Sequence, residues 1–163
     1  MSKEQDYQLL VKQAKALIES ESDYIANAAN LSALLFNSLE KLNWAGFYFV
    51  RNNELVLGPF QGQVACVRIA IGKGVCGTAV STGEIQRVAD VHQFEGHIAC
   101  DAASNSEIVL PVFNQGKVVA VLDIDSPITS RFDEIDQQYL AEIVELYVNS
   151  TELSELCGAD SGV

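Results

Sequence analysis

The first 41 residues carry apolar side chains at helical spacing. Between residues 6 and 19, apolar residues recur every three or four positions with charged residues between them, and this period predicts an amphipathic helix. Ser22 and Asp23 follow an acidic interruption, and either residue can cap a second helix that runs to about Lys41. We interpret both helices as packing or dimer surfaces rather than as parts of a functional site.

The middle of the chain changes to the two-residue period of β-strands. Residues 44–50 are aromatic and β-prone, and their alternation places Trp44 and Tyr48 on the same face of a predicted strand. Either both rings are core aromatics, or they line an apolar pocket in which Gly46 gives room between them. A turn at 51–54 predicts a hairpin with the next strand. Further strands are predicted at 55–57, 64–71 (with Cys66), 85–88, 107–113 and 118–125, with residues 58–62 as a loop.

Acidic side chains lie on the last predicted strand. Strict alternation places Val119, Val121, Asp123 and Asp125 on one face of the strand 118–125. Carboxylates that share a face with valines are costly if they are buried without a partner. This face is therefore a candidate for a polar site.

The order of predicted elements indicates the fold class. Two helices precede the strands, a long irregular connection covers 90–106, and a final helix covers 132–149. We predict an α+β fold, with a central antiparallel sheet, the N- and C-terminal helices packed on one face, and a ligand pocket under the long loop on the other. We expect a single domain over 1–155 and a flexible C-terminal tail over 156–163.

The composition is that of an acidic, globular chain. The 163 residues have a formal net charge of −12, and 48% of them are hydrophobic. Nucleic acids and anionic lipids require clustered Lys and Arg, so we expect neither as a partner. The acidity either keeps the protein soluble or marks a pocket for a cationic ligand. Residues 1–6 lack the apolar segment of a secretory signal, so we expect a cytoplasmic protein.

A glycine-rich run over 72–77 has the spacing G-x-G-x-x-G. A dinucleotide-binding fold needs a full crossover helix after such a run, but Gly83 ends the predicted helix after little more than one turn. We therefore do not predict a nucleotide site. The glycines are expected to shape a loop that places Cys76 near a helix N-terminus, where the pKa of its thiol would be lowered.

The cysteines and histidines do not have the spacing of a structural zinc site. Cys66, Cys76 and Cys100 form no C-x-x-C pair. His92, His97 and Cys100 are close enough in sequence to bind a metal together, but this signal is weak. We predict neither a metal nor any other cofactor.

Cys100 is the cysteine whose surroundings favour thiol chemistry. It lies in a polar, irregular segment between His97 and Glu107. A histidine there can favour the thiolate. A reactive thiolate needs a second thiol to recover after oxidation, because a sulfenic acid condenses with a thiol to a disulfide. Either Cys66 or Cys76 can serve, and sequence spacing does not decide between them.

These motifs together resemble the free methionine-(R)-sulfoxide reductases (fRMsr), a family of GAF domains. The most specific block is G-H-I-A-C-D at 96–101, together with all three cysteines named above; general GAF domains share the fold but not these cysteines. The matching blocks follow the family's order at 42–48, 57–62, 66–69, 72–79, 88–92, 94–101, 104–109 and 122–127.

The resemblance implies roles for the thiols. Cys100 matches the family's catalytic cysteine, Cys66 the principal resolving cysteine, and Cys76 a third cysteine that takes part in recycling. It implies that Cys100 attacks the sulfur of free L-methionine-(R)-sulfoxide, and that a Cys66–Cys100 disulfide follows. A thioredoxin-type dithiol then reduces this disulfide. The implied biological role is repair and antioxidant defence, and the family suggests a homodimer.

The resemblance also implies a substrate site. Trp44 and Tyr48 match the aromatic wall around the S-methyl group, and Glu107, Asp123 and Asp125 match the acidic substrate-binding positions. Two other classes stay open on the sequence. One is a GAF module that binds a small ligand without catalysis, and the other is a redox sensor that responds to peroxide.

Overall fold

The computed structural model describes residues 1–98, 100 and 102–160 of the chain. Six strands form one sheet in the order β3-β2-β1-β6-β5-β4, and all neighbouring strands are antiparallel. The strands are β1 (Trp44–Arg51), β2 (Glu54–Gly62), β3 (Arg68–Ala70), β4 (Gln86–Val88), β5 (Ser106–Asn114) and β6 (Lys117–Ser126). The helices are α1 (Lys3–Ile18), α2 (Tyr24–Ser38), α3 (Gly74–Thr82), the 3-10 helix η1 (Val91–Gln93) and α4 (Glu134–Ser150).

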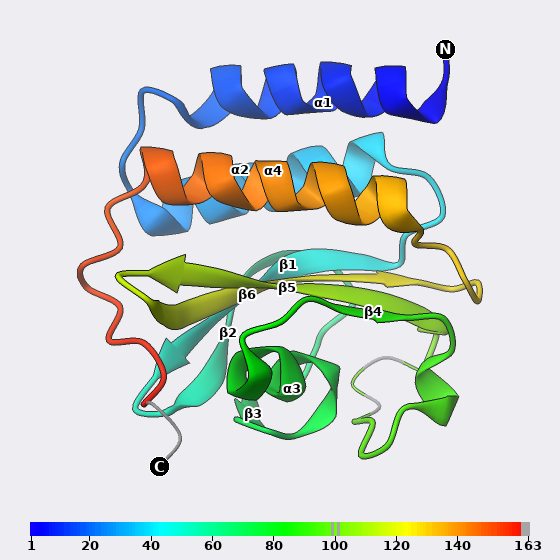
Figure 1. Ribbon diagram of the computed structural model, residues 1–163, viewed down its shortest axis with the longest axis vertical. Coiled ribbons are helices and arrows are strands. Elements are labelled where there is room, and N and C mark those ends of the chain that lie inside the picture. Colours follow the sequence, from blue (N-terminus) through cyan, green and yellow to red (C-terminus); the bar gives the residue numbers. More distant parts are fainter. Residues whose placement is uncertain (99, 101, 161–163) are drawn as a thin grey trace.

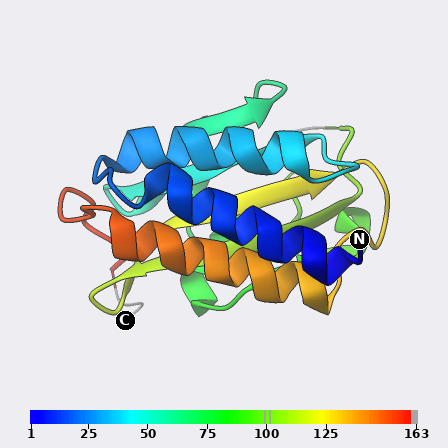
Figure 2. The ribbon, with the colours of Figure 1, turned by 90° about the horizontal axis from the view of Figure 1, so that it is seen from above.

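The elements form layers on both sides of the sheet. Figure 1 shows α2 and α4 against one face and α3 against the other. Viewed from above, α1 lies across α2 and α4 as an outer layer (Figure 2). The predicted α+β class, with N- and C-terminal helices on one face, is confirmed.

The N-terminal helices begin where the sequence supplies caps. Ser2 and Gln5 form a capping box at the start of α1, so this helix begins three residues earlier than predicted. Asp23 caps α2 through the N–H groups of Ile25 and Ala26, as its position predicted. Four apolar residues of α1 are buried, namely Tyr7, Leu10, Ala14 and Ile18, whereas Leu17 of the predicted stripe is exposed.

The alternation of β1 separates two cores. Ala45, Phe47 and Phe49 pack on the helix side of the sheet, whereas Trp44 and Tyr48 pack on the α3 side. These faces are those predicted. The core on the α3 side holds the candidate site. One face of β1 therefore packs against the helices, and its other face contributes residues to the candidate site.

The strict alternation predicted for β6 is wrong at one end. The register shifts between Val112 and Phe113, whose partners on β6 are Ala120 and Val118. Because one residue of β6 is passed over, Val119 packs with the helix-side core instead of sharing a face with Val121. Asp123 lies beyond the shift.

The predictions for residues 58–67 need two corrections. Residues 58–62 continue β2 instead of forming a loop, because they pair with the start of β1 as far as Gly62–Trp44. The predicted strand 64–71 is reduced to β3. Cys66 therefore lies in the connection between β2 and β3, not in a strand.

The start of the predicted flexible tail packs against the domain. Leu156 is buried in the helix-side core, and the N–H of Ala159 donates to the carbonyl of Val118. Residues 161–163 lie outside the described residues. Among the helices described, none has the length and apolar character needed to cross a membrane.

Candidate active site

The sheet register brings three carboxyl groups together on the α3 side. Glu107 on β5 pairs with Asp125 on β6, and Asp123 is two residues before Asp125 on the same strand. Across the sheet, Trp44 pairs with Asp125. The exposed fractions of the three acidic residues are only 8%, 5% and 9%. We call Glu107, Asp123 and Asp125 the acidic cluster.

Burial holds protons on the acidic cluster. Desolvation raises the pKa of Glu107 and of Asp125 well above the ordinary value, and the charge of Asp123 raises both further. The pKa of Asp123 is also raised by burial, but hydrogen bonds from the side chains of Glu107 and Cys76 oppose the rise. Asp123 is therefore the first of the three to ionise, while Glu107 and Asp125 favour the neutral acid.

Within the described part of the chain, two oxygens of the acidic cluster have no hydrogen-bond partner. These are Oδ1 of Asp123 and Oδ1 of Asp125, and both atoms are buried. A buried acceptor without a partner costs free energy. A ligand that donates hydrogen bonds, above all a cation, would relieve this cost.

Cys76 lies in the first turn of α3 but is not an activated thiol. It is free and buried, and burial, followed by the charge of Asp123, raises the pKa of its thiol well above the ordinary value. The expectation of a lowered pKa is therefore wrong, because desolvation beside carboxylates outweighs the helix N-terminus.

Among residues 1–98, 100 and 102–160, one set of side chains has the spacing of metal ligands. The Cys76 sulfur and carboxyl oxygens of Glu107 and Asp123 lie within 4.8 Å of one another. Binding a metal there would require Cys76 and Glu107 to lose protons that burial favours. The sequence suggested a different set of metal ligands, His92, His97 and Cys100. In the structure, Nε2 of His92 lies 3.1 Å from Oδ1 of Asn105, and Cys100 is in a disulfide.

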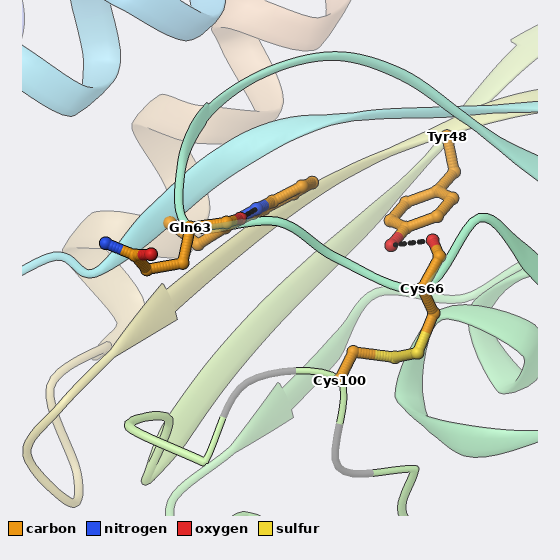
Figure 3. The surroundings of a disulfide bond; sticks show 5 residues. Tyr48, Gln63, Cys66 and Cys100 are labelled. Carbon is orange, nitrogen blue, oxygen red and sulfur yellow. Dashed lines mark hydrogen bonds between the residues drawn. A yellow bond between two sulfur atoms is a disulfide. The ribbon is translucent and has the colours of Figure 1, made fainter.

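Cys66 and Cys100 form a disulfide, with Cα atoms 5.3 Å apart. Figure 3 shows the bond joining the segment between β2 and β3 to the long connection before β5. Both cysteines are half-buried. The sequence left open whether Cys66 or Cys76 is the partner of Cys100. In this structure the partner is Cys66.

The two site aromatics hold the segment that carries Cys66. The Tyr48 hydroxyl donates to the carbonyl oxygen of Cys66 at 2.9 Å (Figure 3), and the Trp44 indole N–H donates to the carbonyl of Gln63 at 3.1 Å. The two rings stack with centroids 5.8 Å apart. Burial raises the pKa of Tyr48, and Asp123 raises it further, so the hydroxyl remains a donor.

Phe60 packs on the site residue Trp44, a contact that the sequence did not indicate. Its ring stacks on Trp44 with centroids 5.2 Å apart. Gly46 was expected to give room between Trp44 and Tyr48, but a Cβ there would collide with Phe60. Reading 54–62 as one continuous strand opposite β1 would have placed Phe60 beside Gly46.

The acidic cluster, Trp44, Tyr48, Cys76 and Cys100 line one cavity of about 40 Å³. This is far below the roughly 300 Å³ at which small-molecule pockets begin. Cys100, which the disulfide ties to Cys66, is part of the lining of this small cavity. Lining residues that the sequence did not indicate are Ala65, Ile69, Lys73, Gly74, Val75, Ile98 and Ser104.

His97 lines the cavity as a largely neutral imidazole. Burial lowers its pKa, and His92, with ring centroids 6.2 Å away, lowers it further. A histidine was expected to favour the Cys100 thiolate. His97 would do so as a base, not as a fixed positive charge.

The chain is similar to known proteins over most of its length. Residues 26–149 match the model of the GAF domain family. "Protein YtsP" of Bacillus subtilis is 62% identical over 88% of this chain and 89% of that protein. "Free methionine-R-sulfoxide reductase" of Escherichia coli is 53% identical over 88% and 87%. The structure of the fRMsr of Staphylococcus aureus in complex with substrate is 58% identical, covers 88% and 94%, and has a TM-score of 0.85.

Proposed function

The chain belongs to the GAF domain family, and we propose that it acts as a free methionine-(R)-sulfoxide reductase, as its E. coli relative is named. The observation that carries the proposal is the Cys66–Cys100 disulfide, whose Cys100 lines one cavity together with the acidic cluster, Trp44 and Tyr48. A module that only binds a ligand needs no such pair of thiols. The acting unit in this proposal is the single domain of residues 1–155.

The reaction begins at Cys100 in the reduced protein. Its thiolate attacks the sulfoxide sulfur while the sulfoxide oxygen takes a proton, so that the oxygen is transferred, Cys100 becomes a sulfenic acid, and methionine leaves. A neutral carboxyl of the acidic cluster supplies the proton. Glu107 and Asp125 are the candidates, because burial raises the pKa of both carboxyl groups well above the ordinary value.

The acidic cluster also explains a preference for the free amino acid. The buried Oδ1 atoms of Asp123 and Asp125 lack a donor among the residues that the structure describes, and the ammonium group of a free amino acid can supply several donors. A residue inside a peptide has no ammonium group. Trp44 and Tyr48, stacked on the same face, are the apolar wall for the S-methyl group.

Recovery of Cys100 uses the second thiol. Cys66 attacks the Cys100 sulfenic acid, which releases water and gives the disulfide present in this structure. A thioredoxin-type dithiol then reduces the disulfide by exchange and is itself oxidised. This cycle requires a reducing compartment, so we place the protein in the cytoplasm. Cys76 is buried and protonated, and we give it the later role of a third thiol that exchanges with the pair.

The direct test uses chromatography to measure the methionine that the protein releases from free L-methionine-(R)-sulfoxide. The assay contains a thioredoxin reducing system. We expect many turnovers with the (R) epimer and none with the (S) epimer. If the (R) epimer gives no methionine, the proposed function is wrong.

Replacing Cys66 with serine is expected to leave about one methionine per protein from the pre-reduced enzyme and then to stop. Cys100 can still attack the sulfoxide, but its sulfenic acid finds no thiol at Cys66 to form the disulfide. Rapid quench with quantification of methionine checks this. The matched control is Cys157→Ser, since Cys157 is a free, exposed thiol outside the site. Normal multiple turnover of Cys66→Ser would transfer the resolving role to Cys76.

Exposed apolar side chains lie within two residues of each disulfide cysteine in the sequence and favour docking of the reductant there. The exposed fractions are 84% for Val64, 60% for Val67 and 39% for Ile98. A dithiol reductase has to approach the disulfide closely enough for its thiolate to attack a sulfur, so its contact surface must cover these residues. Thioredoxin-type partners with an apolar surface around their dithiol fit this patch.

Val67→Glu is expected to raise the reductant concentration for half-maximal turnover by about 5- to 10-fold. Steady-state rates at varied thioredoxin measure this, and the first turnover of the pre-reduced variant should be unchanged. Ile25→Glu is the control, because Ile25 is 50% exposed but lies on α2, on the other side of the sheet. Equal effects of both variants would contradict docking at the disulfide.

We also propose a homodimer. The outer helix α1 exposes Leu9 by 47% and Leu17 by 41%, and their separation of eight residues places them on one face of the helix. An apolar face on an outer helix supports association through α1.

A further inference from the structure

Cys76 is a buried thiol that lies against the acidic cluster. Its sulfur and carboxyl oxygens of Glu107 and Asp123 lie within 4.8 Å of one another, and all three residues are buried. They come from three different elements, α3, β5 and β6, and the side chains of Cys76 and Glu107 both hydrogen-bond to Asp123. The fold therefore gathers one sulfur and two oxygens at one place inside the domain.

Asp125 adds an independent observation that points to a cation. Its Oδ1 atom is buried and has no hydrogen-bond partner within the described part of the chain. The residue is only 9% exposed, and it lines the same cavity as Cys76, Glu107 and Asp123. A buried acceptor needs either a hydrogen-bond donor or a cation. With Asp125, the cavity offers the four ligands that zinc takes in closed sites.

The cavity has the size of an ion rather than that of an organic ligand. Its volume is about 40 Å³, whereas small-molecule pockets begin at roughly 300 Å³ and a single water needs only about 10–15 Å³. A metal ion that has exchanged its water shell for side-chain ligands therefore fits the space that the structure provides.

A divalent ion can enter the buried cluster without a change in net charge. Metals bind the thiolate and carboxylate forms of their ligands, so binding releases one proton from Cys76 and one from Glu107. Two protons leave as one doubly charged ion enters. The free-energy cost of burying charge in the cavity is thus kept low.

The mixed set of ligands selects the class of ion. Thiolate ligands favour zinc and softer metals, whereas magnesium and calcium prefer ligands that are all oxygen. One thiolate with carboxylates therefore fits Zn²⁺ best, and Co²⁺ can replace it as a spectroscopic probe.

We propose that Cys76, Glu107, Asp123 and Asp125 bind a zinc ion, and that this ion competes with the substrate. The competition rests on the proposed function, which gives the ammonium group of the substrate the Oδ1 atoms of Asp123 and Asp125. The ion is then an inhibitor and not a cofactor, because it occupies carboxyl groups that the reaction at Cys100 uses.

The binding test uses the protein with its Cys66–Cys100 disulfide intact, so that Cys76 and Cys157 are the free thiols. Co²⁺ is titrated into Cys157→Ser, which lacks the exposed thiol, and the sulfur-to-cobalt charge-transfer absorption is recorded. We expect the absorption to saturate at one ion per chain. Zn²⁺ should displace the Co²⁺, while Mg²⁺ and Ca²⁺ at the same concentration should not. Absence of this absorption overturns the zinc site.

Variants in the Cys157→Ser background identify the ligands. Loss of an outer-shell partner lowers metal affinity by about 10- to 100-fold, so Cys76→Ser, which removes a ligand, should lower the Co²⁺ affinity by at least about 100-fold and abolish the absorption. Glu107→Gln should lower the affinity by at least about 10-fold and keep the absorption. Glu142→Gln, at an exposed position on α4, is the control and should change neither. Unchanged affinity in both Cys76→Ser and Glu107→Gln overturns the proposal.

Competition with the substrate is measured where no reaction occurs. With Cys66, Cys100 and Cys157 all replaced by serine, Cys76 is the one thiol left in the chain. Free L-methionine-(R)-sulfoxide is added to this protein after loading with Co²⁺, and we expect the apparent Kd for Co²⁺ to rise in proportion to the sulfoxide concentration. A Kd that does not respond overturns the competition. Cobalt binding is read without turnover, so failure of the proposed function is seen separately, as wild-type enzyme that releases no methionine in the absence of metal.

Discussion

Cys100→Ser is expected to lower the release of methionine from free L-methionine-(R)-sulfoxide by at least about 1,000-fold, because a serine hydroxyl is neither ionised nor strongly nucleophilic at neutral pH. The variant also cannot form the disulfide with Cys66, so neither a first turnover nor recycling remains. Quantification of methionine in both single-turnover and steady-state assays measures the loss.

Cys100→Ser tests whether Cys100 is the nucleophile. Cys157→Ser, at an exposed free thiol, should keep wild-type rates and controls for loss of a thiol as such. If Cys100→Ser retains a substantial first turnover, another thiol attacks the sulfoxide. Cys76 would then be the candidate, although burial keeps its thiol protonated.

Glu107→Gln is expected to lower kcat by about 100-fold or more, because a proton donor at the sulfoxide oxygen is lost or misplaced. The same variant should unfold at higher urea concentration at neutral pH, with a gain of about 1–2 kcal/mol in the free energy of unfolding. Glutamine resembles the neutral carboxyl that burial favours, and its amide can still donate to Asp123.

The sign of the pH dependence follows from the raised pKa of Glu107. The folded state favours the protonated form, so the contribution of Glu107 to stability is fully present below its ordinary pKa of 4.5 and is lost as the pH rises through the higher folded pKa. The gain from Glu107→Gln should therefore be small in acid and grow toward alkaline pH. Urea unfolding at several pH values, in one fixed redox state, measures it.

The control for Glu107→Gln is Glu142→Gln, since Glu142 is exposed on α4. It should change neither turnover nor the pH dependence of unfolding. Wild-type kcat in Glu107→Gln would move the proton donor to Asp125. A loss of stability that is constant with pH would contradict the assignment of a raised pKa.

Periodicity in the sequence predicted the framework of the site correctly. The alternation of β1 separated Trp44 and Tyr48 from the helix-side core, and the alternation of β6 placed Asp123 and Asp125 on one face. These predictions succeeded because a strand with one buried face fixes the direction of every second side chain. The sheet register then determined that Glu107 lies opposite Asp125.

The predictions failed where tertiary contacts override local preference. Gly58 and Pro59 are typical of loops, yet they continue β2 because β1 pairs with them. The sequence predicted that a helix N-terminus lowers the pKa of Cys76. The structure buries this thiol beside carboxylates, which raise its pKa instead. The parts played by Phe60, Lys73 and Ile98 depend on how a strand and two loops meet over the sheet, which no sequence period encodes.

The most direct measurement for the central claim is thiol titration of the fully reduced protein before and after one addition of free L-methionine-(R)-sulfoxide, with peptide mapping of the product. We predict the loss of two thiols for each methionine released and a disulfide that maps to Cys66 and Cys100. An unchanged number of free thiols would leave a module that binds without catalysis, and the same loss with peroxide alone but not with the sulfoxide would indicate a redox sensor. Either result would contradict the account.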